Sequence, residues 1–168
     1  TTTFLERAAG EGVFLMEVLK RKIDMVANKY GSDLIAYENY SLLALSTLYG
    51  IELLEDNAQK CVMNMYQLYY EAYQQLANIH KKKMKDNVLS SAKLIISRNI
   101  AQGNFLTKKS SSGNPLVFSE WKVINLVEGA RNLIVQRTEY TLNDIFGGVE
   151  KGNGEMETEK DRAEQIDL

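Results

Sequence analysis

The sequence has one cysteine, one histidine and one proline among its 168 residues. A single cysteine, Cys61, excludes an intrachain disulfide and the paired cysteines of a zinc knot. The lone histidine, His80, excludes the carboxylate-bridged di-iron bundles, which need two Glu-x-x-His motifs. Pro115 stands alone as well, so the commonest helix breaker is missing from the rest of the chain. These absences exclude most metal and redox sites and favour long helices.

Catalytic motifs are missing too. No Gly-x-Gly-x-x-Gly motif opens a helix after a strand, and no phosphate-loop pattern is present. His80 ends an apolar stripe beside three lysines, where the negative end of a helix dipole explains it. Cys61 lies in the middle of another stripe, which is typical of a small buried hydrophobic residue. We therefore predict that the protein is not an enzyme, and we predict no cofactor, metal or small-molecule substrate.

Apolar residues recur at three- and four-residue steps through most of the chain, which is the spacing of amphipathic helices. After a first turn capped by Thr3 and Glu6, the spacing and the capping residues predict helices over 16–30, 33–49, 52–83, 87–103 and 120–146. Gly31 is placed to end the first of these in a left-handed conformation. The predicted fold class is all-α, a bundle of about five helices.

The longest predicted helix carries two adjacent apolar stripes, which together are wider than one neighbouring helix covers. We therefore expect it to be the central helix of the bundle. Four tyrosines cluster on it: Tyr66, Tyr69, Tyr70 and Tyr73. Core packing explains such a cluster, and a protein interface is the alternative, because tyrosine combines a large apolar area with a polar tip.

Two segments break the helical pattern. Residues 104–118 hold two short apolar pieces around a serine-rich centre, which indicates a small β-hairpin or an excursion loop. Residues 147–168 hold four glycines, seven acidic residues and no aromatic residue, so this stretch cannot bury enough apolar surface to order itself. We predict a helical domain over 1–146 and a flexible acidic tail over 147–168.

Charge is distributed unevenly along the chain. Residues 80–109 hold one acidic residue and eight basic ones: Lys81, Lys82, Lys83, Lys85, Lys93, Arg98, Lys108 and Lys109. A solvated helix end accounts for the first lysines, since basic residues there complement the helix dipole. It does not account for the last four. The alternative is a surface that contacts the phosphates of nucleic acid without reading sequence.

The most apolar window, residues 34–54, contains Glu38, Asn39 and Glu52, so we interpret it as protein core and predict no membrane association. In size and helical character the chain resembles the small helical adaptors of viral and phage particles, a likeness of architecture that rests on no shared motif. Taken together, these features predict a cytoplasmic structural protein that forms a homo-oligomer or docks into a larger assembly. A sequence-independent nucleic-acid-binding protein is the alternative.

Overall fold

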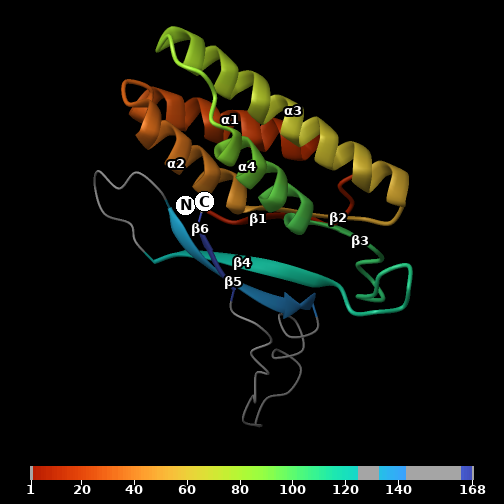
Figure 1. The fold of residues 1–168 in the computed structure, drawn as a ribbon. Coiled ribbons are helices and arrows are strands. Elements are labelled where there is room, and N and C mark those ends of the chain that lie inside the picture. Colours follow the sequence, from red (N-terminus) through yellow and green to blue (C-terminus); the bar gives the residue numbers. More distant parts are fainter. Residues whose placement is uncertain (1, 125–132, 143–163, 168) are drawn as a thin grey trace.

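The computed structural model describes residues 2–124, 133–142 and 164–167. These residues form a mixed α/β protein, in which four helices and a small parallel sheet make one part and an antiparallel sheet makes the other. Figure 1 shows the antiparallel sheet beneath the helices, on the side of α2 and α4. The predicted all-α bundle is therefore wrong.

The four helices are packed side by side around one apolar core. Gly12, before the first helix, touches Cys61 of the third, and His80 at the far end of the third bonds to Gly31 after the first. These two helices therefore run in the same direction, and the other two run against them. Their bounds are α1 (Val13–Tyr30), α2 (Leu34–Ser46), α3 (Glu55–Ile79) and α4 (Asp86–Asn99).

Three short parallel strands lie at one end of the helices, in the order β1 (Phe4–Glu6), β2 (Leu48–Glu52) and β3 (Ile100–Gln102). A pair of helices connects each strand to the next, which supplies the long crossover that parallel pairing requires. The central strand, β2, is almost completely buried. A Cβ atom on its Gly50 would lie 2.8 Å from Leu15 Cδ1, so any larger residue at this position would require the ends of neighbouring side chains to shift.

The second sheet is antiparallel, with the strand order β4 (Val117–Val123), β5 (Ile134–Thr141) and β6 (Glu164–Asp167). Strand β6 belongs to the predicted acidic tail, and residues 147–163 of that tail lie outside the described residues. On β4, Trp121 and Val123 pack into the helical core, whereas Glu120 and Lys122 are exposed. This alternation is the period of a strand with one covered face.

The predicted helix over 120–146 is therefore wrong where the structure describes it. Its segments are rich in β-branched and aromatic residues, which fit a pleated surface better than a helix. Trp121 and Ile124 stand three residues apart and imitate a helical face. Pairing decides against a helix, because β4 pairs with β5 along its whole length, from Val117 to Val123. Val127 of the predicted helix lies outside the described residues.

Other predicted boundaries need correction. Residues 4–6, 48–52 and 100–102 are strands rather than helix ends, and α3 stops at Ile79 rather than at Lys83. Gly31 ends α1 with φ −62°, so it is not left-handed. The segment 104–118, predicted as a hairpin or an excursion loop, is a loop with two isolated antiparallel bridges, Asn104 to Lys109 and Lys109 to Pro115, while Val117 and Phe118 at its end pair with β5. Asp33 does cap α2, and its carboxylate accepts bonds from the backbone N–H groups of Ile35 and Ala36.

The central helix is α2 rather than the longest helix, α3. Eight of the thirteen residues of α2 are buried, against six of twenty-five in α3. The antiparallel sheet explains the difference, since it covers the side of α2 that faces away from α1 and α3. Figure 1 shows α3 along the outer edge of the helical layer, far from this sheet.

A buried amide joins the two parts of the protein. Asn99, at the end of α4, is 1% exposed. Its Nδ2 donates to the backbone oxygens of Ser46, at 3.2 Å, and of Leu48, at 3.0 Å. Its Oδ1 accepts a bond of 2.8 Å from Trp121 Nε1 on β4. The end of α2, the start of β2 and the antiparallel sheet therefore all meet at one side chain.

Replacing this amide should destabilise the whole protein. In Asn99→Leu, two buried backbone carbonyls and the half-buried indole N–H lose this partner, which should lower the free energy of unfolding by about 2–4 kcal/mol. Urea denaturation followed by circular dichroism and by the fluorescence of Trp121 measures this loss. Asn64→Ala, which removes an exposed bond from an amide to the Glu11 carbonyl, is the matched control and should cost less than about 1 kcal/mol. Equal losses of stability in the two variants would contradict this role of the Asn99 amide.

Candidate functional site

The exposed side of α3 carries an apolar and aromatic strip, formed by Met63, Tyr66 and Tyr70. Met63 is 69% exposed, and both tyrosines are half-buried. The three residues follow one another at steps of three and four, so they share one face of the helix. The rings of Tyr66 and Tyr70 lie 6.3 Å apart, which is contact distance for aromatic pairs. We call these three residues the α3 strip.

The other two tyrosines of the predicted cluster point inward. Tyr69 and Tyr73 are completely buried in the core. The hydroxyl of Tyr69 shares a hydrogen bond of 2.9 Å with Ser41 Oγ, and the hydroxyl of Tyr73 accepts one of 3.0 Å from the backbone N–H of Lys85. The predicted interface residues therefore divide into a core pair and a surface pair, and Met63, which the sequence analysis did not single out, joins the surface pair.

A buried carboxylate lies beside the core tyrosines. Glu38 on α2 is 2% exposed, and neither of its oxygens accepts a hydrogen bond from the described residues. Lys85 Nζ lies 3.3 Å from Glu38 Oε1 and supplies the opposite charge. Because burying an unpaired carboxylate is costly, this ion pair fixes the link between α3 and α4 against α2. Lys85 Nζ is therefore paired within the chain, although 47% of its side chain remains exposed.

Burial raises the pKa of several tyrosines, because the charged phenolate is poorly solvated inside the protein. The pKa is raised to about 12 at Tyr37, Tyr49 and Tyr73 and is also raised at Tyr69. The negative charge of Glu38 adds to the effect at Tyr69 and Tyr73. These hydroxyls are consequently neutral at physiological pH, and they hold the core together rather than serve as nucleophiles.

The predicted basic region is divided in space. Lys81, Lys82 and Lys83 are exposed at the link between α3 and α4. Lys81 adopts φ 54°, and the N–H of Lys82 bonds back to the Ala77 carbonyl, a common helix ending that holds this short lysine run against the end of α3.

The other basic residues lie along α4 or beyond it. Lys93 and Arg98 are exposed on the helix itself. Lys108 and Lys109 follow β3, past the opposite end of α4 from the first lysines. A helix of 14 residues is ~21 Å long, so the structure does not gather the eight residues into one compact patch.

His80 and Cys61 have structural environments. His80 Nε2 lies 2.7 Å from the Gly31 carbonyl, which it bonds as a donor, and so it fastens the end of α3 to the end of α1. Cys61 is buried against Gly12, and burial together with the nearby Glu52 raises the pKa of its thiol to about 11. A protonated, buried thiol is a poor nucleophile.

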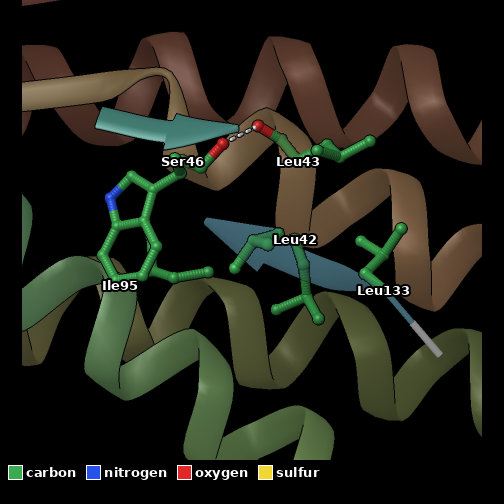
Figure 2. A pocket seen from close by; sticks show the side chains of 7 residues that line it. Leu42, Leu43, Ser46, Ile95 and Leu133 are labelled. Atoms are coloured by element: carbon green, nitrogen blue, oxygen red, sulfur yellow. Dashed lines mark hydrogen bonds between the residues drawn. The ribbon is translucent and has the colours of Figure 1, made fainter. Parts of the chain in front are cut away.

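The described residues leave little space for a small molecule in the crevice between the two parts. Figure 2 shows an apolar crevice among α2, α4 and the antiparallel sheet, lined by Leu42, Ile95 and Leu133 among others. Side chains fill it so closely that no water molecule fits, which makes it a packing seam. In the described part of the chain, no group of three or more histidine, cysteine or acidic side chains is arranged to hold a metal ion. No described helix is long and apolar enough to cross a membrane.

Comparison with known proteins identifies no relative of this chain. No protein-family model matches the sequence, and no curated protein or solved structure shows significant similarity to the chain. The likeness to helical viral and phage adaptors loses its basis as well, because it rested on an all-α architecture. The described surface also exposes apolar side chains such as Val13 and Leu106, whereas the α3 strip and the run of Lys81, Lys82 and Lys83 each group several side chains of one kind.

Alkaline pH is expected to destabilise the protein through its buried hydroxyls. A phenol whose pKa is raised by folding stabilises the folded chain fully below pH 10, its ordinary pKa, and this contribution is lost as the pH rises toward 12. The loss should be on the order of 2 kcal/mol at each of Tyr37 and Tyr73. Urea denaturation at a series of pH values measures it. Tyr37→Phe should flatten the decline, whereas Tyr70→Phe, which removes a half-buried surface hydroxyl, should leave it unchanged. An identical decline in both variants would contradict this origin.

Proposed function

We propose that this protein is a non-enzymatic structural subunit of a protein assembly and that it docks to other protein chains through the α3 strip. The observation that carries the proposal is the exposure of Met63 beside the half-buried rings of Tyr66 and Tyr70, all on one helix face. Methionine and tyrosine are enriched at protein interfaces, where they combine large contact area with adaptable or amphipathic side chains. The buried, unpaired Cys61 suits a reducing compartment, and we propose the cytoplasm.

The position of α3 supports this role. The antiparallel sheet and the other helices stabilise the fold from the side of α2, so the outer side of α3 is left without a neighbour among the described residues. Most exposed positions on that side are polar, among them Lys60, Gln67 and Glu71, and the α3 strip is its apolar margin. Leu53 and Leu54, just before α3, are also more than half exposed.

Site-specific photo-crosslinking tests the docking role. With a photo-reactive residue at position 63, in the natural host cell, we expect a discrete adduct whose mass equals the chain plus whole protein subunits. The same residue at Gln75, on the other exposed flank of α3, should give no such adduct, and Tyr70→Glu in the chain that carries the label at position 63 should abolish it. Failure to form a discrete adduct at position 63 would contradict the proposal.

Nucleic-acid binding is the second candidate, and one observation favours it: Lys81, Lys82 and Lys83 are consecutive and exposed. Three adjacent cations displace the counterions that surround a phosphate backbone, so binding should weaken steeply with salt. The separation of Lys108 and Lys109 from this run, by the length of α4, restricts the footprint to the end of α3.

Exchange of these lysines tests the second candidate. Changing Lys81, Lys82 and Lys83 to glutamine should reduce the slope of log K against log salt concentration by about 3 for duplex DNA, because each phosphate contact contributes about 0.9. Fluorescence anisotropy with a labelled duplex measures the slope. Changing Lys108 and Lys109 to glutamine is the matched control, and the slope should not move. If the unmodified chain fails to bind the duplex at low salt, nucleic-acid binding is eliminated.

A further inference from the structure

We infer that the partner of the α3 strip is a second copy of this chain and that the two α3 helices pair antiparallel across a two-fold axis. This inference rests on the docking role proposed above and makes it specific. Two features of α3 carry it, namely the apolar strip near the middle of the helix and opposite charges at its two ends.

The charges fix the orientation of the pair. Glu55 and Asp56 are exposed in the first turn of α3, and Lys81, Lys82 and Lys83 are exposed just past its last turn. Parallel pairing would bring the acidic ends of the two copies together and the lysines together, and both contacts are repulsive. Antiparallel pairing brings each acidic end to the lysines of the other copy. Charge complementarity of this kind selects the orientation of an interface.

The strip and the charges agree on one register. When Tyr66 of one copy lies opposite Tyr70 of the other, the two-fold axis passes between these positions, and Met63 of each copy lies one turn away. In the same register, Glu55 of one copy stands opposite Lys81 of the other. The surface is then self-complementary, as a two-fold interface must be, because every contact occurs twice.

The size of the surface sets the strength of the dimer. A helix of 25 residues is ~37 Å long and ~10 Å wide, so a single helix face offers only a few hundred Å² from each copy. Stable interfaces bury about 800 Å² from each partner. The expected dimer is therefore reversible and depends on concentration, and salt should weaken it because its end charges are exposed.

Sedimentation velocity of the full chain over a wide concentration range tests this dimer. The unmodified protein should change from monomer to dimer as its concentration rises. Met63→Glu should remove the dimer at every concentration tested, because it places charges against the rings of the other copy. Gln75→Glu, on the other exposed flank of the same helix, is the matched control and should retain it. Circular dichroism and Trp121 fluorescence establish that each variant is folded.

Charge reversal tests the orientation. Glu55→Lys with Asp56→Lys should weaken the dimer at least tenfold, and the further changes Lys81→Glu and Lys82→Glu should restore it, since each end then faces its opposite again. An unmodified chain that stays monomeric, a dimer that survives Met63→Glu, or a folded fourfold variant that fails to recover each overturns the inference. If the chain is monomeric while position 63 still crosslinks to a different protein, the docking role stands and only the self-pairing is wrong.

Discussion

The amide of Asn99 determines how the two parts of the protein fit together. It is one of the few polar groups in an otherwise apolar seam, and each of its hydrogen bonds goes to a different segment: the end of α2, the start of β2 and the indole of Trp121. A displaced sheet would break the bond between the half-buried Trp121 Nε1 and the buried Asn99 Oδ1 and leave both groups unpaired. The neighbouring Arg137, which donates to Ser119 Oγ and Glu139, extends the polar seam along the sheet. Polar bonds therefore specify the register of a contact that apolar packing alone would leave adjustable.

A second buried group, the Glu38 carboxylate, fixes how the helices pack at their opposite end. Glu38 sits among Ser41, Tyr69 and Tyr73, and Lys85 reaches it from the link between α3 and α4. The ion pair is weak evidence for stability, because desolvation of the carboxylate offsets much of the attraction. Its geometric consequence is clearer. Because Lys85 Nζ pairs with Glu38, the link between α3 and α4 is tied at one point, and the three lysines before it are exposed at the end of α3.

The sequence predicts what is local in this fold and fails where pairing is long-range. Helices α1, α3 and α4 follow from the repeat of apolar residues, and the Asp33 cap follows from its position before α2. Strands β1 and β3 have three residues each, too few for a period of two to be recognised. Strand β4 pairs with residues 134–141, a partner that no local pattern of Trp121 and Ile124 can reveal. Once a sheet was missed, the burial of α2 and the outer position of α3 could not be predicted, and neither could the division of the four tyrosines.

The charges at the ends of α3 have an ordinary explanation, since acidic residues at the start of a helix and basic residues at its end complement its dipole. That explanation does not compete with the proposed pairing. Any helix charged in this way is complementary to an antiparallel copy of itself. The same end charges that stabilise the helix therefore also favour a two-fold interface. The dipole does not determine which face of α3 meets the other copy, because the end charges are not confined to one face of the helix. That face is determined by the α3 strip, Met63, Tyr66 and Tyr70. These residues form an apolar margin of α3, whose other side packs into the core.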